Sequence, residues 1–158
     1  YKLIDEFRKQ VPNLTLRTTV MVGHPGEGEK EFSELKQFVA QVKFDRLGVF
    51  TYSEEEDTFG SRNFKDVIPG HIKETRAESI MEQQAGISDT LNRKKIGSIQ
   101  KVIIDGREGE LYIGRTEGDS PEVDNEVLIR SAKKLRNGSF YQVRITDTES
   151  YDLIAETI

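Results

Sequence analysis

The chain has 158 residues, of which 32% are charged and 35% hydrophobic, with a net charge of −5 and no cysteine. The lack of cysteine excludes disulfides, thiolate nucleophiles, zinc thiolate sites and cysteine-bound iron–sulfur clusters within these residues. The two histidines, His24 and His71, lie far apart in sequence, so we expect structural or surface roles and no metal site. No apolar run approaches the roughly 20 residues of a membrane span and no secretory signal is evident, which predicts a cytoplasmic protein without a membrane partner.

The first part of the chain reads as alternating helices and strands. Residues 1–10 carry apolar side chains at helical spacing, and we expect them to be the last turns of a helix whose beginning is missing. A strand over 14–22, an amphipathic helix over 29–43 and a second strand over 46–53 follow. This order predicts a right-handed βαβ unit with parallel strands.

The first predicted strand has two unlike faces. Val20 and Val22 share one face, whereas Arg17 and Thr19 share the other. An apolar face against helices and a mixed face inward is typical of a strand in a parallel barrel. The turns after the two strands should then lie at the same end of the barrel, where such folds keep their active sites.

A connector and a long helix come next. The four consecutive acids of residues 54–57 suggest either a cation site or a solvated loop, and the loop is favoured because adjacent like charges seldom converge on one ion. An irregular segment runs to Ile68, and Pro69 then opens a helix about 40 Å long that should stop before Gly97. Five of its residues lie close to one stripe: Ile72, Arg76, Ile80, Ile87 and Leu91. We place the domain boundary between residues 92 and 93.

Residues 93–158 read as a second, all-β domain. Asp105-Gly106 and Asn137-Gly138 are typical of hairpin turns. Short runs rich in β-formers, with turn signals between them, predict a small five-stranded antiparallel β barrel. The expected strands are 98–105, 110–115, 126–131, 140–146 and 151–157. The fold class is therefore α/β plus all-β.

An acidic, turn-rich loop between residues 114 and 127 is the most distinctive part of this domain, and we expect it to be displayed. Residues 1–92 carry 12 Lys and Arg against 16 Asp and Glu, and residues 93–158 carry 11 against 12, so neither half has the basic surface typical of phosphate binding. The loop carboxylates would attract a basic protein. A local basic face keeps nucleic acid open as an alternative partner: Arg130, Lys133, Lys134 and Arg136.

Two parts of the sequence resemble a known family. Thr-Thr-Val-Met-Val-Gly-His-Pro-Gly-Glu at 18–27, with Leu-Gly-Val-Phe-Thr-Tyr-Ser at 47–53, resembles the late barrel strands of radical S-adenosylmethionine methylthiotransferases. Gly-Arg-Thr-Glu-Gly-Asp-Ser-Pro-Glu-Val-Asp at 114–124 resembles the terminal TRAM module of the branch that adds a methylthio group to the β-carbon of an aspartate in a small-subunit ribosomal protein. Transfer-RNA-modifying relatives share Gly-Arg-Thr, followed by a more basic stretch. The alternatives are thus a fragment of a transfer-RNA methylthiotransferase with an RNA-binding TRAM module, or a free-standing binding protein.

The resemblance implies an organisation and a set of cofactors. Residues 1–92 would be the C-terminal portion of a radical S-adenosylmethionine (β/α) barrel with its long linking helix, and residues 93–158 the TRAM barrel. The full-length enzyme would use S-adenosylmethionine and two four-iron four-sulfur clusters, whose cysteine ligands are expected upstream of Tyr1. We therefore expect no catalytic or metal-binding residue in this chain, and no activity from it alone.

Four barrel residues are candidates for the wall near the cofactor: Arg17, Thr19, Phe50 and Tyr52. Arg17 could pair with the methionine carboxylate of S-adenosylmethionine, and an aromatic ring could lie along the adenine. The alternative is that Phe50 is barrel core and Arg17 a structural ion-pair partner.

Five loop residues are candidates for docking the basic ribosomal protein: Arg115, Glu117, Asp119, Glu122 and Asp124. We expect Arg115 to hold the loop through Asp119 or Asp124, and Pro121 to restrict the turn. Glu117 and Glu122 are predicted to contact Lys and Arg of the partner, so that charge steers the encounter.

Overall fold

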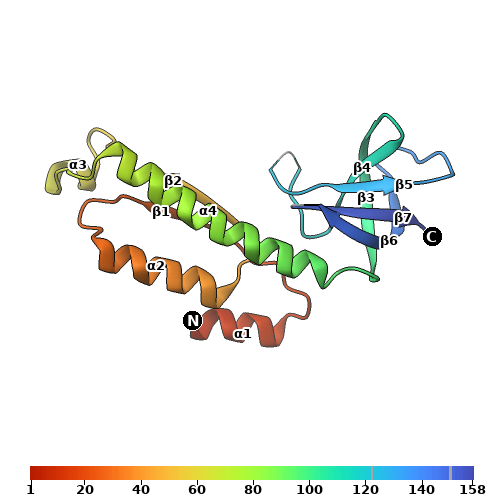
Figure 1. Ribbon diagram of the computed structural model, residues 1–158, viewed down its shortest axis with the longest axis horizontal. Coiled ribbons are helices and arrows are strands. Elements are labelled where there is room, and N and C mark those ends of the chain that lie inside the picture. The colour runs from red at the N-terminus through yellow and green to blue at the C-terminus, as the bar shows by residue number, and fades with distance from the viewer. Residues whose placement is uncertain (122, 150) are drawn as a thin grey trace. The chain divides into compact units, whose positions relative to one another are not determined.

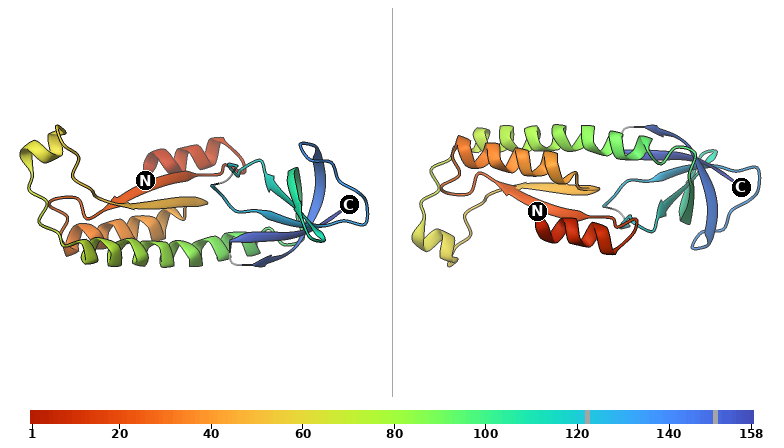
Figure 2. Two further views of the ribbon diagram at one scale, coloured as in Figure 1. Left: turned by 90° about the horizontal axis from the view of Figure 1, so that it is seen from above. Right: turned by 90° about the horizontal axis from the view of Figure 1, so that it is seen from below.

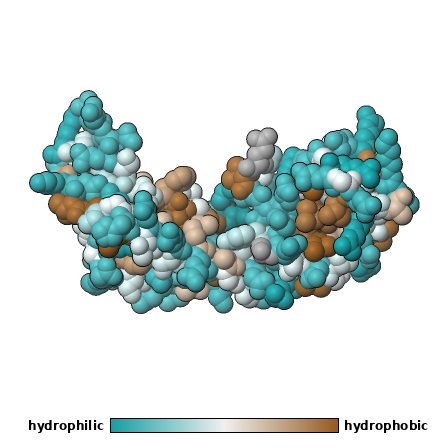
Figure 3. Space-filling view, turned by 45° about the horizontal axis from the view of Figure 1, so that its top comes forward, coloured by the Kyte–Doolittle hydropathy of each residue, from teal (hydrophilic) through white to brown (hydrophobic). Residues whose placement is uncertain are grey.

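The computed structural model describes residues 1–121, 123–149 and 151–158. The chain divides into two compact units, Tyr1–Ile87 and Ser88–Ile158 (Figure 1). Each unit has its own hydrophobic core. Hydrophobic surface is visible among the hydrophilic residues of both units (Figure 3). The exposed large apolar side chains include Met21 and Phe50 in the first unit and Ile99 and Phe140 in the second.

The first unit is built around a parallel pair of strands. Its elements are α1 (Lys2–Gln10), β1 (Arg17–Val22), α2 (Glu29–Val42), β2 (Arg46–Thr51), α3 (Phe59–Asn63) and most of α4 (Gly70–Arg93). β1 and β2 pair in parallel, with Thr19 opposite Gly48 and Met21 opposite Phe50. The predicted βαβ unit is therefore present. The segment expected to be an irregular connector contains α3, which begins where the Thr58 hydroxyl accepts a hydrogen bond from the Ser61 N–H at 3.2 Å.

The two faces of this sheet differ as the alternation of the sequence indicates. Val20, Val22 and Val49 pack in one cluster with Val39 of α2 and Ile80 of α4. Figure 2 shows α2 and α4 on one side of the β1–β2 sheet. On the other face, Arg17, Thr19 and Met21 of β1 and Phe50 of β2 are exposed. That face is the one on which the cofactor candidates were predicted.

The second unit is a closed barrel of five strands in the order β3-β4-β5-β7-β6. These are β3 (Ile99–Glu108), β4 (Leu111–Thr116), β5 (Val127–Arg130), β6 (Phe140–Glu149) and β7 (Asp152–Thr157). β5 and β7 pair in parallel, so the predicted purely antiparallel barrel was wrong at this pairing. The reason is topological: β6 pairs with β3 and β7, not with β5, and β7 turns back from β6 to close the barrel against β5. Closure leaves no free sheet edge.

Two glycine-containing turns predicted as hairpins have other roles. β3 continues through Asp105 and Gly106, where its register with β4 shifts as in a β-bulge, and the hairpin turn falls at Gly109, with φ of 59°. Gly138, with φ of 75°, does lie in a turn, but that turn joins β5 to β6, which are not paired strands. Asp-Gly and Asn-Gly favour sharp backbone changes of several kinds, so the sequence alone did not distinguish a bulge from a hairpin.

Inward-facing side chains from all five strands fill the barrel. Their alternation along each strand explains why the strand runs were recognisable in the sequence. The buried cluster comprises Val102, Ile104, Tyr112, Val127, Ile129, Leu135, Val143, Ile145, Leu153 and Ala155. Both Asn92, at the end of α4, and Asn125 donate a side-chain hydrogen bond to the Tyr151 carbonyl, which ties three segments of this unit together.

Candidate functional sites

The predicted cofactor residues lie on or next to the exposed face of the β1–β2 sheet. Arg17 and Thr19 are exposed, and Phe50 is 64% exposed, so in this chain Phe50 is not part of a core. Tyr52 follows the end of β2, where its N–H donates to the Val22 carbonyl at 2.8 Å. The face therefore carries a guanidinium group, a hydroxyl group and an aromatic ring.

Charged residues that the sequence analysis did not select surround Tyr52. The Lys73 ammonium lies 5.1 Å from the Tyr52 ring centroid, donates to the Tyr52 carbonyl at 3.0 Å and pairs with Asp66 at 2.5 Å. The His24 ring stacks edge-on against Tyr52 with a centroid distance of 5.0 Å. His24 therefore has a packing role, as expected for a structural histidine. Lys73 links the segment after β2 to α4.

The Lys73–Asp66 pair predicts an acid-sensitive first unit. The hydrogen bond from Lys73 holds the pKa of Asp66 below its ordinary value of 3.8. Because the folded-state pKa is depressed, the stabilising contribution of Asp66 is fully present above pH 3.8 and is lost as the pH falls through the lower folded value. Urea denaturation at a series of pH values should show this loss, and Asp66→Asn should remove it. Asp57→Asn, at an exposed ion pair with Arg62, is the control and should keep the wild-type pH dependence.

The acidic loop between β4 and β5 uses two of its carboxylates to hold its own backbone. Asp119 is 8% exposed, and its Oδ2 accepts hydrogen bonds from the Thr116 N–H at 3.1 Å and the Thr116 hydroxyl at 2.5 Å. Asp124 Oδ2 accepts from the Ser120 N–H at 2.6 Å. Aspartates that accept from nearby backbone groups favour tight turns. These contacts fix the loop and give Asp119 and Asp124 structural roles.

The other docking candidates have different surroundings. Arg115, which was predicted to hold the loop through Asp119 or Asp124, donates from its Nε to the Asp105 carboxylate, at 2.9 Å from Oδ2. Glu117 is 73% exposed and lies 3.5 Å from the Lys101 ammonium. Glu122 falls outside the described residues. The partner of Arg115 comes from the neighbouring strand, which loop spacing could not indicate.

A cleft of about 590 Å³ lies beside the loop. It is lined by four carboxylate residues, Asp105, Asp124, Glu126 and Asp152, and by a single cationic one, Arg115, together with smaller polar and backbone groups. Glu126 is exposed. Three of these acids, Asp105, Glu126 and Asp152, were not among the predicted docking residues because they lie outside the resembling segment. The excess of carboxylates makes the cleft suited to basic groups of a partner.

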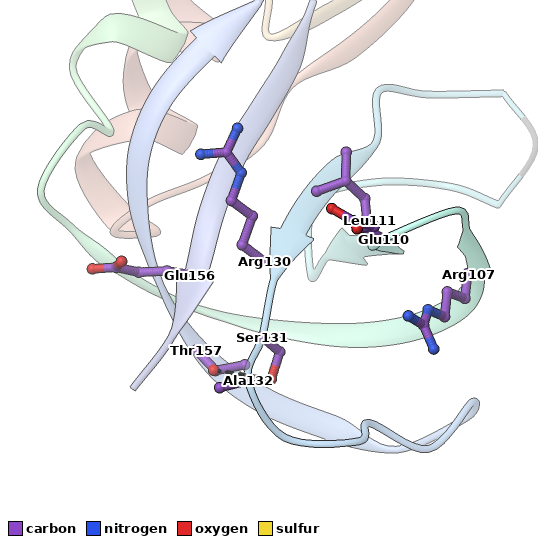
Figure 4. Close-up of a pocket in the computed structure, with 8 residues that line it drawn as sticks. All are labelled: Arg107, Glu110, Leu111, Arg130, Ser131, Ala132, Glu156 and Thr157. Atoms are coloured by element: carbon purple, nitrogen blue, oxygen red, sulfur yellow. Dashed lines mark hydrogen bonds between the residues drawn. The ribbon is translucent and has the colours of Figure 1, made fainter.

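A second hollow of about 620 Å³ opens elsewhere on the barrel. Arg107 and Arg130 are balanced there by Glu110 and Glu156. Figure 4 shows the side chains of Arg107, Arg130 and Glu156 pointing in different directions. Balanced and divergent charges do not form the convergent cationic site that a phosphate requires. Of the predicted basic face, only Arg130 lines this hollow.

Among residues 1–121, 123–149 and 151–158, no group of three or more His, Asp or Glu side chains is placed to hold a metal ion. Within the same described ranges, none of the helices combines the length and the apolar character needed to cross a membrane.

Comparison with known proteins identifies the second unit and the relatives of the whole chain. Residues 96–158 match the TRAM domain family. Over its whole length the chain is 56% identical to a protein of Bacteroides fragilis named ribosomal protein uS12 methylthiotransferase RimO, of which it covers 37%. Proteins of the same name from Bacteroides thetaiotaomicron and Parabacteroides distasonis are 55% and 46% identical, with 36% and 37% of their lengths covered. The resemblance read from the sequence is confirmed, and the chain spans little more than a third of the relatives it matches.

Proposed function

We propose that this chain is the C-terminal part of a ribosomal protein uS12 methylthiotransferase that acts on an aspartate β-carbon. The observation that carries the proposal is the similarity of the entire chain, at 46–56% identity, to proteins of that name. In this proposal residues 1–92 complete a radical S-adenosylmethionine barrel and residues 93–158 form its TRAM module. The enzyme would work in the cytoplasm, where ribosomal proteins are found.

The residues of this chain fit S-adenosylmethionine but not the clusters. Arg17, Thr19 and Phe50 offer an exposed guanidinium, hydroxyl and ring on one sheet face, whereas the chain has no cysteine to ligate iron. When bound, S-adenosylmethionine and the clusters supply the radical chemistry that functionalises an unreactive carbon. In this chain, Arg17 would bind the methionine carboxylate, and Phe50 and Tyr52 would flank the adenine.

We expect the isolated chain to be inactive because cluster ligands are missing. Reconstitution with iron and sulfide, followed by chromatography for 5′-deoxyadenosine, should show product from a full-length protein and none from this chain. Production of 5′-deoxyadenosine by residues 1–158 alone would contradict the assignment of the clusters to the remainder of the protein.

The TRAM module is the proposed docking device for the substrate protein. Glu117 projects from the loop with 73% of its side chain exposed, and Glu126 is exposed at the cleft beside it. Ribosomal proteins that bind RNA are basic, so complementary charge would steer the encounter and strengthen it at low salt. Because the carboxylates of Asp119 and Asp124 hold the loop, we assign direct contact to Glu117, Glu122 and Glu126.

Charge reversal tests this docking role. We expect the Glu117→Lys and Glu126→Lys double variant of this chain to bind purified uS12 about tenfold more weakly at low ionic strength, with a smaller difference at high salt. Isothermal titration at two salt concentrations measures both quantities. Glu110→Lys is the matched control, since it makes the same charge change at the second hollow. Equal affinity of the double variant and wild type at low salt would refute docking by these residues.

The transfer-RNA alternative rests on one specific observation. Phe140 is 59% exposed and the Lys101 ammonium lies 4.7 Å from its ring centroid, a pairing of ring and cation that can accept a stacked base. The same titration with bulk transfer RNA separates the candidates. Tighter binding of RNA than of uS12, with a steep salt dependence and loss on Phe140→Ala, would move the parent enzyme to the RNA-modifying branch.

A further inference from the structure

Arg76, a buried arginine on α4, donates hydrogen bonds to the turn that follows β1. Arg76 is 8% exposed along its side chain, and its Nη1 donates to the Glu27 carbonyl at 3.0 Å and to Glu27 Oε1 at 2.8 Å. Its Nη2 donates to Glu29 Oε1, in the first turn of α2, at 2.7 Å. One guanidinium group therefore joins α4, the turn and the start of α2. These hydrogen bonds to carboxylates, that to Glu29 first, raise the pKa of Arg76.

The Glu27 carboxylate that binds Arg76 also binds the backbone at the start of the same turn. Its Oε1 also accepts a hydrogen bond from the Gly23 N–H at 3.0 Å, and its side chain is only 10% exposed. The Glu27 carboxylate therefore bridges Arg76 and the first residue after β1. A change at Arg76 would reach the backbone of Gly23 through a single carboxylate group.

Stability alone is a poor explanation for such a network. Buried ion pairs often contribute less to folding than apolar residues of similar size would, because two charges must leave water. They are, however, directional, and a guanidinium group that donates to two carboxylates and a carbonyl fixes the positions of its acceptors. The arrangement is better suited to holding a backbone segment in one geometry than to strengthening the core that lies beneath it.

The position of the turn in the fold indicates that its fixed geometry has a role in ligand binding. Residues 23–28 follow the carboxyl end of β1, and parallel α/β folds bind their ligands at the carboxyl ends of the strands. Met21 and Phe50, paired across β1 and β2 and both more than half exposed, lie on the adjoining open face. A ligand bound on that face would contact the backbone of residues 23–28 at the edge of the face.

We propose that Arg76 is a positioning residue for the S-adenosylmethionine site, acting through Glu27 to hold the 23–28 turn in its ligand-binding geometry. This inference rests on the proposed function, because the cofactor is the one that function requires. It assigns Arg76 no contact with the cofactor itself. Its effect should therefore appear in cofactor affinity and in the dynamics of the turn, and not in the affinity for uS12.

The test uses the full-length, reconstituted enzyme with three variants. Arg76→Met removes the guanidinium and leaves Glu27 buried without its charge partner. Arg76→Met combined with Glu27→Gln also removes the uncompensated carboxylate, so that stability is restored while the link to Gly23 is weakened. Arg93→Met is the matched control, because Arg93 pairs with Asp89 on the same helix in a more exposed setting.

Four readouts separate positioning from folding: the dissociation constant for S-adenosylmethionine by equilibrium dialysis, the dissociation constant for uS12, amide hydrogen exchange in residues 23–28, and the melting temperature. We expect both Arg76 variants to bind the cofactor about tenfold more weakly and to exchange faster in the turn, with unchanged uS12 affinity and, for the double variant, a melting temperature near wild type. Arg93→Met should match wild type in all four readouts.

The outcomes distinguish this inference from the function on which it rests. Wild-type cofactor affinity in the double variant, or weakened binding without faster exchange in the turn, would overturn the positioning role alone. Weakened cofactor binding in both variants together with a wild-type enzyme that transfers no methylthio group to uS12 would support the positioning role and overturn the proposed substrate. A wild-type enzyme that binds no S-adenosylmethionine would overturn both.

Discussion

Replacing Gly114 with alanine should destabilise the TRAM barrel by about 1–3 kcal/mol, the usual cost of forcing extra volume into a packed interior. Gly114 is buried in β4, between Ile104 and Val127 of the neighbouring strands. A Cβ at this position would lie 2.5 Å from the Ile103 carbonyl oxygen and 3.3 Å from Ile129 Cδ1. The closer atom belongs to backbone in a paired strand, so it cannot rotate away as a side chain would.

Gly106→Ala is the matched control for this prediction. It lies in the paired strand β3, and a Cβ there meets no atom within 4 Å. Its cost should stay within about 0.5 kcal/mol, as for most open positions. Urea denaturation followed by amide NMR signals of the barrel measures both variants. A Gly114→Ala protein as stable as Gly106→Ala would show that β3 and β4 do not approach as closely as described. The glycine of the Gly-Arg-Thr segment is thus required by strand packing and not by loop chemistry.

The sequence predicted well those elements in which one face is buried and the other exposed, because apolar and polar residues then alternate along the element. The alternation of Val20 and Val22 with Arg17 and Thr19 identified both faces of β1, because one face packs on helices. The parallel closure of β5 on β7 could not be predicted in this way. Alternation fixes which face of a strand is buried but carries no information about the direction of its neighbour.

In the candidate sites, likewise, contacts between residues close in sequence could be predicted, whereas contacts that depend on strand register could not. The loop contacts of Asp119 and Asp124 span three and four residues, and the sequence marked both as loop acids. The Arg115–Asp105 pair depends on the β3–β4 register, including the bulge, and was missed. Arg76 was placed on the apolar stripe of α4. A charged residue within such a stripe was the available signal that a buried acceptor faces it, and that acceptor is Glu27.

Gly23→Ala should destabilise the first unit by about 1–3 kcal/mol through backbone strain, with a further cost from crowding. Gly23 has φ of 75°, and a Cβ there would lie 2.4 Å from Lys73 Cγ and 2.8 Å from Cδ. Lys73 cannot easily move aside because its ammonium is held by Asp66 and by the Tyr52 carbonyl. Gly26→Ala is the control: its φ of 94° brings similar backbone strain, but no atom lies within 4 Å.

A double-mutant cycle isolates the crowding from the backbone strain. Lys73→Ala removes the two crowding carbons and leaves only its own Cβ, 3.1 Å away, which needs a shift of a few tenths of an ångström. Gly23→Ala should therefore cost less in the Lys73→Ala background, with a favourable coupling of about 0.5–3 kcal/mol, whereas Gly26→Ala should show none. Strictly additive losses for the Gly23 pair in urea denaturation would contradict the contact. Lys73 also donates to the Tyr52 carbonyl, so this contact places α4 against both the turn after β1 and the segment after β2, the two segments that border the proposed cofactor face.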